Sequence, residues 1–422
     1  MSTTAADERS GSLHIFRHRG FAVFFAAASL SNGGSWMQLV AVQALLFDLT
    51  DSGSWLGLST VVSLVPAVLL TPYAGVLADR VSRQSILQIT QTVQMASAFA
   101  LWGLYVSEVI TPWWIVFIGF VNGVSTGFQQ AAWQSFVPLL VPETDMLHAV
   151  RLNSTQYTLA RALGPAFGGL VVKLGGIGAA IFVNATTYVL VIVTLLVVRP
   201  RANETFARDR GVWEGLRDGA LYIWERRPLR LAVLLALAAS TFGQSLQYVA
   251  SALSERLYGH GSDGNAGLLT ALGIGSLFSS GITVAFAGRL RRSAQGITAT
   301  LSYVAAIALL STTSSYLVAQ GAYFLAGVAH LQVAVALNTL IQGAVPDEYR
   351  GRATSFYLLG ILAGIPIGSQ MLGSVGDVFG FRTALVVDGS ALLLLAVTLF
   401  VTGWWRDLDA TPEDLEPALA PA

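Results

Sequence analysis

Long apolar stretches separated by short polar connections recur along the whole chain. Many are about 20 residues long, the length that an α-helix needs to cross the hydrocarbon core of a bilayer. Proline within several of them is compatible with a span, because neighbouring helices can satisfy the freed backbone groups. The pattern therefore predicts an all-α integral membrane protein. Its twelve predicted spans lie at about 20–47, 55–78, 84–106, 112–138, 150–174, 177–198, 229–252, 265–288, 295–311, 315–343, 354–377 and 381–403.

Composition agrees with this prediction and excludes several classes of function. Hydrophobic residues make up 54% of the 422 positions and charged residues only 11%, against about a quarter charged in soluble chains. The formal net charge is zero, so we expect no nucleic-acid partner. There is no cysteine, which excludes thiol catalysis and cysteine metal sites. Without a catalytic triad, phosphate loop or metal-ligand spacing, we expect no enzyme, no cofactor and no metal site.

The distribution of arginine predicts the orientation in the membrane. With the N-terminus inside, arginines cluster in the inner loops and the outer side keeps only Lys173, Arg256 and Arg382. The positive-inside rule then places both termini in the cytoplasm and the chain in the inner (cytoplasmic) membrane. The inner group comprises Arg17, Arg19, Arg80, Arg83, Arg151, Arg289, Arg291, Arg292, Arg350, Arg352 and eight arginines between Arg199 and Arg230.

The longest connection divides the spans six and six. Within it, GVWEGLRDGALYIWERR places Trp213, Leu216, Ala220 and Trp224 on one helical face. Such a helix fits the membrane surface, and it fits equally well packed beneath the bundle. The predicted organisation is an N-terminal segment 1–19, a six-helix bundle 20–198, a central cytoplasmic loop 199–228, a second six-helix bundle 229–403 and an acidic cytoplasmic tail 404–422.

The two bundles read as weak repeats of each other. LADRVSR at 77–83 matches FAGRLRR at 286–292, although glycine replaces the acid in the second copy. GPAFGG at 164–169 is matched by GIPIGS at 364–369. Parallel repeats of six helices describe a transporter architecture with its substrate site between the halves, near the midplane.

At the first of these segments the chain resembles the major facilitator superfamily. GVLADRVSR is similar to that family's loop signature between its second and third helices, matched by Gly75, Asp79, Arg80 and Arg83. SNGGSWMQLVAVQALLFDLTDS, AAWQSFVPLLVP, ARALGPAFGGLV and VPDEYRGRATS resemble the exporter branch that contains enterobactin-type siderophore exporters and macrolide efflux pumps. The resemblance implies secondary active export by a monomer in the lipid bilayer, commonly driven by proton entry. The arginine that drug–proton antiporters often carry in the fourth helix is missing from VNGVSTGFQQAAW.

Asp79 is the residue of this loop that topology does not explain. A carboxylate can sit at the positive N-terminus of another helix, and such a contact made in only one state biases a two-state equilibrium. The resemblance implies a partner near Gly351 to Ser355 and a locked state that faces outward. The alternative is a solvated turn whose arginines only fix topology.

A second motif is the end of the antiporter signature in the fifth span, Gly164, Pro165, Gly168 and Gly169. Small residues let helices approach closely, and proline weakens the local hydrogen-bond ladder. We expect a hinge, or a tight seal against a helix of the other half. Simple close packing is the alternative. The glycines expected upstream in this signature are missing.

Three ionisable residues stand out well inside predicted spans, where such residues are costly and commonly functional. Asp388 could take up a proton because burial favours a neutral carboxyl group. His330 titrates near neutral pH, and Arg161 could hold an anionic substrate or pair with an acid. Structural ion pairs or hydrogen bonds are the alternative for each.

By the same resemblance, the first, fourth, seventh and tenth helices line the cavity. Gln244, Gln247 and Tyr248 follow i, i+3, i+4 spacing and so should share one helical face. Amides beside aromatic rings suit a large, mainly uncharged amphiphile: a siderophore, macrolide or other secondary metabolite. Polar contacts between helices are the alternative role, and an uptake permease, a uniporter or a non-transporting scaffold or sensor are the alternative functions. The cavity candidates are Asn32, Trp36, Gln38, Asn122, Gln129, Gln130, Trp133, Gln244, Gln247, Tyr248, His330, Gln332 and Asn338.

Overall fold

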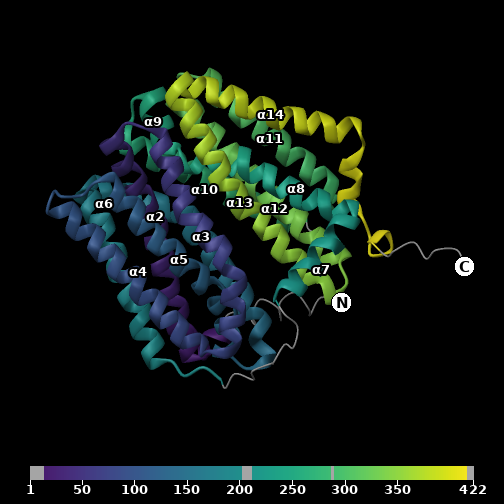
Figure 1. Ribbon diagram of the computed structural model, residues 1–422, viewed down its shortest axis with the longest axis horizontal. Helices are drawn as coiled ribbons and strands as arrows, with labels where there is room; N and C mark the ends of the chain where they lie inside the picture. Colours follow the sequence, from purple (N-terminus) through teal and green to yellow (C-terminus); the bar gives the residue numbers. More distant parts are fainter. Residues whose placement is uncertain (1–13, 202–211, 287–288, 416–422) are drawn as a thin grey trace, which may run out of the picture. The chain divides into compact units, whose positions relative to one another are not determined.

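The computed structural model describes residues 14–201, 212–286 and 289–415, and within these ranges the chain forms helices and their connections, with no strand (Figure 1). The predicted all-α class is confirmed. The longer helices are α2 (Arg19–Thr50), α3 (Gly53–Arg80), α4 (Arg83–Val106), α5 (Pro112–Phe136), α6 (Met146–Val197), α7 (Val212–Glu225), α8 (Arg227–Phe242), α9 (Ala250–Tyr258), α10 (Gly261–Ala285), α11 (Arg292–Thr312), α12 (Tyr316–Ala344), α13 (Asp347–Phe379) and α14 (Phe381–Val401).

Several of these helices are long and apolar enough to cross a membrane. By length and hydropathy alone, 8 segments of the described residues qualify. Helix α6 contains two spans separated by a kink, and α8 forms one interrupted span with η4 (Gln244–Tyr248) and α9. With α2, α4 and α5 added, the described helices are consistent with the twelve predicted spans.

The chain divides into two compact units. The first comprises Met1–Leu45 and Pro66–Asp209, and the second comprises Leu46–Val65 and Arg210–Ala422. The division therefore runs through α2 and α3, so the end of α2 and the beginning of α3 belong with the C-terminal helices. The hydropathy pattern predicts a boundary only in the central loop. It does not predict that residues 46–65 belong to the second unit.

Large apolar side chains join the helices of the first unit. Phe24 of α2 lies 4.9 Å from Trp133 and 5.3 Å from Phe136 of α5, measured between ring centroids. Leu87 of α4 and Leu195 of α6 are fully buried in the same cluster. Burial of this apolar surface holds one end of α2, α4, α5 and α6 together.

A glycine divides α6. Gly176 has φ 77° and ψ 176°, which is a non-helical conformation that residues with a side chain rarely adopt. The break falls between the predicted spans 150–174 and 177–198, so the sequence locates this turn correctly.

Helices of the second unit approach each other closely at glycines. Gly275 and Gly327 bring α10 and α12 together, since a Cβ on either would clash with a backbone carbonyl of the other helix. Gly364 and Gly368 of α13 do the same against the end of α8. Glycine, which has no side chain, thus permits the close spacing of these two helix pairs, as is common among membrane helices.

The predicted span 229–252 is interrupted rather than continuous. Helix α8 ends at Phe242, a 3₁₀-helix η4 follows, and α9 begins only at Ala250. The ring of Tyr303 occupies the space that a side chain on Gly243 would need. In a 3₁₀-helix residues i and i+3 align but i+4 does not, so the expected common face of Gln244, Gln247 and Tyr248 is wrong: Gln244 and Gln247 align and Tyr248 diverges.

The predicted central-loop helix is present as α7. The side chains of Trp213 and Leu216 lie outside the described residues. Its described buried side chains are those of Tyr222 and Ile223, and Tyr222 stacks on Tyr349 of α13 with ring centroids 4.0 Å apart. Trp224, expected on the apolar face, is 65% exposed. Helix α7 therefore packs within the second unit through Tyr222, and its Trp224 side chain is exposed.

The beginning of the predicted acidic tail also packs on the second unit. Leu408 is fully buried, and Asp407 forms an ion pair of 2.7 Å with Arg227 of α8. Burial raises the pKa of the Asp407 carboxyl group, although the Arg227 charge opposes this shift. Arg292 donates to the Ala410 carbonyl at 2.7 Å, and Arg226 donates to that of Leu415 at 2.8 Å.

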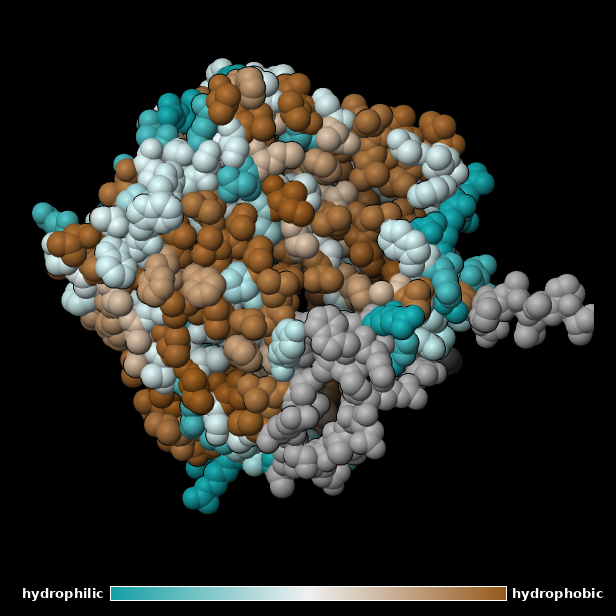
Figure 2. Space-filling view, in the orientation of Figure 1, coloured by the Kyte–Doolittle hydropathy of each residue, from teal (hydrophilic) through white to brown (hydrophobic). Residues whose placement is uncertain are grey.

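Exposed apolar side chains cover much of the remaining helix surface. Leu196, Phe400 and Val401 are 68, 71 and 78% exposed. Figure 2 shows one face of the molecule, on which apolar residues (brown) occupy much of the visible helix flanks. Contiguous apolar surface of this kind is expected where helices face lipid.

We predict that Gly176→Ala destabilises the fold by about 1–2 kcal/mol, because a Cβ strains the backbone at positive φ. No atom lies within 4 Å of the added Cβ, so the effect is conformational and not steric. Thermal unfolding of the detergent-solubilised protein should show a lower midpoint. Gly103→Ala, which also has open space but lies within α4, is the control and should not lower it. Equal midpoints for the two variants would contradict the prediction.

Candidate functional site

The predicted gating loop lies at the end of α3 and the beginning of α4. Gly75, Asp79 and Arg80 belong to the last turns of α3, and their side chains lie outside the described residues. Arg83 is the first residue of α4, and its Nη1 donates to the Ser135 carbonyl of α5 at 3.0 Å. A cation at the negative C-terminal end of a helix is stabilising. Arg83 therefore ties α4 to α5.

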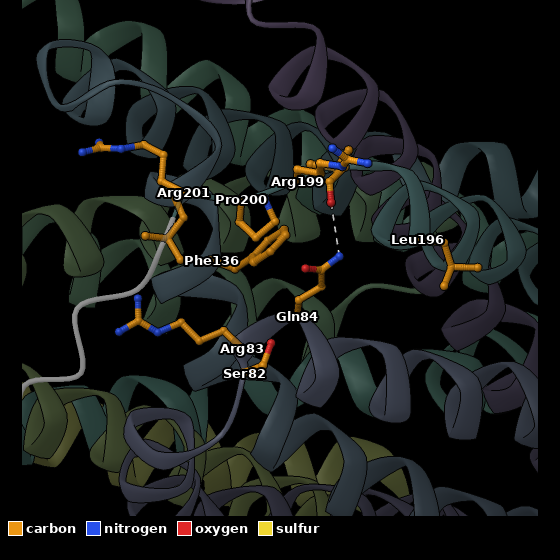
Figure 3. Close-up of a pocket in the computed structure, with 10 residues that line it drawn as sticks. Ser82, Arg83, Gln84, Phe136, Leu196, Arg199, Pro200 and Arg201 are labelled. Carbon is orange, nitrogen blue, oxygen red and sulfur yellow. Dashed lines mark hydrogen bonds between the residues drawn. The ribbon is translucent and has the colours of Figure 1, made fainter.

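A cavity of about 460 Å³ opens beside Arg83 in the first unit (Figure 3). Gln84 enters it from α4 and donates to the Val198 carbonyl at 3.2 Å. Arg201 on its wall forms an ion pair of 2.8 Å with Glu143. The wall also carries Arg199, so the cavity is rich in positive charge.

The glycines of the antiporter-like motif pack on α2. A Cβ on Gly164 would lie 2.5 Å from the Cβ of Trp36, and one on Gly168 would lie 3.0 Å from the Cα of Met37. Pro165 is buried and Gly169 half-buried within the same stretch of α6. We expected a seal against the other half, and for these two glycines that expectation is wrong. They let α6 approach a helix of their own unit.

Arg161 and Trp36 meet at this helix contact. The guanidinium carbon lies 5.2 Å from the centre of the Trp36 ring, in a cation–π arrangement. Arg161 stands one turn before Gly164 on α6, so the close approach of the helices brings the cation over the ring. Arg161 and Trp36, which were predicted as separate candidates from the sequence, therefore form one contact.

Other polar candidates of the first unit join helices through amide pairs. Asn32 of α2 donates to Gln156 of α6 at 3.2 Å, and Gln156 donates to Asn153 at 3.3 Å. Asn153 also accepts from the indole N–H of Trp133 at 3.2 Å. This network links α2, α6 and α5.

A second group of amide side chains forms short hydrogen bonds between helices. The Gln38 side chain accepts from Asn184 at 2.7 Å, and the Gln129 side chain accepts from Gln94 at 2.7 Å. By contrast, the buried Oδ1 of Asn122 has no hydrogen-bond partner among the described residues. Polar contacts between helices thus account for Gln38 and Gln129. Asn122 keeps an acceptor that a bound molecule could use.

In the second unit one polar candidate, His330, lies beside Tyr303 of α11. Its hydroxyl lies 3.4 Å from Nδ1 of His330, which is half-buried on α12, and its ring packs on Gly243. Gln244 and Gln247 are buried nearby in the chain. The buried Oε1 of Gln332 has no partner among the described residues, and Asn338 is exposed.

Asp388 lies by itself in α14. It is completely buried, and neither carboxylate oxygen has a hydrogen-bond partner among the described residues. The neighbouring Gly389 packs on Ile307 of α11. Burying a carboxyl group without a partner in a membrane span is unfavourable in free energy. The presence of Asp388 therefore suggests a functional role.

Comparison with known proteins identifies the family. The profile of a family described as transmembrane secretion effectors matches residues 10–419. The chain belongs to this family. Its curated relatives include an MFS-type transporter of Bacillus subtilis, 24% identical over 92% of this chain and 94% of the relative. The predicted resemblance to the major facilitator superfamily is thereby confirmed.

Two relatives are named for what they move. Macrolide efflux protein A of Streptococcus pyogenes is 20% identical over 92% of this chain and 97% of its own length. A staphyloferrin A transporter of Staphylococcus aureus is 21% identical over 90% of this chain and 95% of its own. The first is named for efflux and the second for transport of a siderophore, the two substrate types of the resemblance predicted from the sequence.

Solved structures agree on the fold. A bacterial homologue of the human lysosomal transporter Spinster superposes with a TM-score of 0.73 at 14% identity, covering 96% of this chain and 99% of that one. A D-xylose–proton symporter superposes with a TM-score of 0.70 at 13% identity, covering 92 and 97%. The protein is therefore a multi-pass membrane transporter of the major facilitator type. Proteins of this family and fold are not enzymes.

Sequence reasoning missed the role of Asp377 in this transporter. Its carboxylate accepts from the backbone N–H groups of Gly53 at 2.7 Å and Ser54 at 2.8 Å, at the N-terminus of α3. The hydroxyls of Ser52 and Ser54 donate to it at 2.6 Å each. All four residues belong to the second unit. This is the carboxylate-to-helix contact that the sequence suggested for Asp79, found at the opposite end of the same helix.

Proposed function

We propose that the protein exports an amphiphilic small molecule by alternating access, as a proton-coupled antiporter in the inner membrane. The observation that carries the proposal is the near full-length similarity to relatives named for efflux. Besides the macrolide efflux protein, these include a multidrug efflux pump of Mycolicibacterium fortuitum, 21% identical over 92% of this chain and 96% of its own.

The substrate class follows from the neutral character of the candidate side chains. Asn122 and Gln332 each keep a buried amide oxygen without a partner among the described residues, and a bound hydroxyl or amide could supply the missing donor. Trp36 adds an aromatic face. Such groups favour a large and mainly uncharged molecule over a small, highly charged metabolite. A macrolide, a siderophore and another secondary metabolite all fit this description.

Arg161 qualifies this picture of a neutral site. Its guanidinium lies over the Trp36 ring, and a guanidinium group is well suited to bind an anionic group of a substrate. Siderophores commonly carry carboxylates or catecholates, whereas macrolides do not. Arg161 is thus the residue whose contribution separates the two substrate types.

Proton coupling is assigned to Asp388, with His330 as the second candidate. Asp388 is buried without a partner among the described residues, so gain or loss of a proton changes the charge of a lipid-embedded helix directly. The described ionisable residues of the helices packed against α14 include Tyr303 on α11 and Tyr357 and Asp377 on α13. His330 contacts the Tyr303 hydroxyl, which connects it to α11 as well.

Gating is assigned to Asp79 at the end of α3, with the beginning of α13 as its partner in the alternate state. Arg83 ties α4 to α5, so helix packing gives this arginine a role of its own. The side chain of Asp79 lies outside the described residues. A helix N-terminus would stabilise its charge by up to about 2 kcal/mol.

Two rival functions share most of these features. An uptake permease or uniporter would use the same fold, and the staphyloferrin A transporter is named without a direction. A non-transporting scaffold or sensor would need a signalling surface, and the described part of the tail packs against its own unit. The direction of proton-driven movement distinguishes these three.

Everted membrane vesicles with an acidified lumen test the proposal, using radiolabelled erythromycin as the probe. The wild-type protein should accumulate the probe in the lumen, because protons leave the vesicle as substrate enters. Asp388→Asn should remove the dependence on the proton gradient. Asp414→Asn, a fully exposed carboxylate of the tail, is the control and should behave as wild type.

Accumulation only with an alkaline lumen would indicate uptake, and retained gradient dependence in Asp388→Asn would move the coupling role to His330. Parallel assays with an apo-siderophore separate the two substrate types. Arg161→Gln should impair transport of the anionic probe more than that of erythromycin.

Asp79→Asn should lower the initial rate of erythromycin export by about tenfold, the factor that corresponds to a latch of 1–2 kcal/mol. Protein abundance in the membrane should stay near wild type, since the positive charges that direct insertion remain. Glu108→Gln neutralises an exposed acid at the other end of α4 and serves as control. Wild-type export by the Asp79 variant, measured at equal abundance, would remove the gating role.

A further inference from the structure

Three side chains with metal-binding atoms meet in the first unit. His14, His18 and Asp145 each offer one ligand atom, and these three atoms all lie within 4.8 Å of one another. Nε2 of His18 lies 2.8 Å from Oδ2 of Asp145. The amino-acid sequence alone predicts no metal site here, because Asp145 lies 127 positions after His18 in the chain. The cluster is therefore a product of the fold.

The backbone that carries the two histidines is fixed by its neighbours. His14 and His18 flank the short 3₁₀-helix η1 (Ile15–Arg17), and the His18 N–H donates to the Ile15 carbonyl at 3.1 Å. Ile15 is 1% exposed in the core of the unit, and the ring of Phe16 packs edge-on against that of Phe25 in α2. The two imidazole rings themselves meet edge to face, with centroids 6.3 Å apart. The turn thus holds both histidines on the same side of the chain.

Asp145 stands at the N-cap of α6 without capping it. An aspartate at this position commonly accepts from a backbone N–H of the first helical turn, yet its side chain forms no such hydrogen bond. Its Oδ2 lies beside His18 instead. The nearby Glu143 has a different partner, since its carboxylate accepts from Arg201 at 2.8 Å. Of these two acids, Asp145 is therefore the one directed to the histidines.

We propose that His14, His18 and Asp145 bind a divalent transition-metal ion such as Zn²⁺. Two imidazole nitrogens and one carboxylate oxygen are a donor set that suits this class of ion. Ligand atoms of a tetrahedral zinc site stand about 3.3 Å apart, given bond lengths of about 2.0 Å. No pair of ligand atoms in the cluster is separated by more than 4.8 Å, so rotations of the side chains would bring them to that spacing.

The site is open enough for an ion to enter. His14 is exposed, and the side chains of His18 and Asp145 are 28 and 23% exposed. Three protein ligands leave the fourth tetrahedral position to water, as in zinc sites that remain open to solvent. An entry path and a plausible ligand set are the two properties that a metal site must show.

An ion pair between His18 and Asp145 is the simpler explanation for two of the three residues. Pairs that are partly exposed contribute little to stability, and such a pair does not account for the approach of His14. A metal ion accounts for all three, because it needs several ligands at one point. Measured binding of zinc, and its dependence on His14, therefore separates the two explanations.

A bound ion would join two segments of the first unit that are distant in the chain. The turn η1 precedes α2, whereas Asp145 immediately precedes α6. Because the site exists only in the folded protein, binding would stabilise the fold and hold the chain ahead of α2 against the beginning of α6. The proposal does not depend on the substrate, on the direction of transport or on proton coupling.

Zinc titration by calorimetry tests the site on the full-length protein in detergent, purified with a tag that contains no histidine and treated with a chelator. We expect His14→Ala and Asp145→Asn each to reduce the affinity by at least about tenfold, since even the loss of a group that orients a ligand costs this much. His14→Ala leaves the His18–Asp145 pair in place, so its effect does not come from loss of that pair. Mg²⁺, which prefers oxygen ligands, should not bind at this site.

Two neighbouring residues provide matched controls. His148→Ala removes a histidine one turn into α6 but outside the cluster, and Glu143→Gln neutralises the acid that pairs with Arg201. Both should keep the wild-type affinity. Absence of zinc binding by the wild type, unchanged affinity in His14→Ala and Asp145→Asn, or an equal loss in either control would overturn the site.

Thermal unfolding gives an independent measurement of the same binding. Zinc in excess of its dissociation constant should raise the unfolding midpoint of the wild-type protein, because it binds the folded state, and a chelator should reverse the rise. The rise should be smaller in His14→Ala and complete in His148→Ala. A wild-type midpoint that does not respond to zinc would contradict the stabilising role.

Discussion

Polar groups inside a membrane-spanning helix must find their partners within the protein, and this constraint shapes the amide contacts between the helices of the first unit. Lipid offers no hydrogen bonds, so the amides of α2, α4, α5 and α6 pair with each other across helices. Asn184 to Gln38 and Gln94 to Gln129 are the shortest of these pairs. The same constraint makes departures from it informative. Asp388 and the free amide oxygens of Asn122 and Gln332 are groups for which the described protein supplies no partner.

Close helix approach is the second requirement, because it brings the partners within reach. Gly164 and Gly168 let α6 lie against α2, and the Arg161 side chain is thereby placed over the Trp36 ring. In the second unit Gly53, Gly57 and Gly373 allow the contact beneath Asp377. Glycine in these helices weakens the isolated helix. It contributes instead to the geometry between helices, where side chains would hold the backbones apart.

Hydropathy was sufficient for most of the spans and for the break at Gly176, since both are properties of local sequence. It failed at Gly243, because the ring that fills its missing side chain belongs to Tyr303 on another helix. Motif reasoning selected Arg161 and Trp36 individually, yet nothing in the pattern indicates that they meet. The contact of Asp377 with Gly53 joins residues 324 positions apart. Pairings of this kind depend on tertiary packing, and a single sequence does not contain them in readable form.

The stacked rings of Tyr222 and Tyr349 have a mechanical consequence for the connection between the two halves of the chain. Arg226 lies over the Tyr222 ring at 3.7 Å and donates to the Leu415 carbonyl, so these contacts join α7, the start of α13 and the end of the described chain. Helix α7 is therefore attached to α13 and is not a loose connection between the two halves. A force applied to the central loop would act on α13 itself, and through it on the carboxylate at its far end.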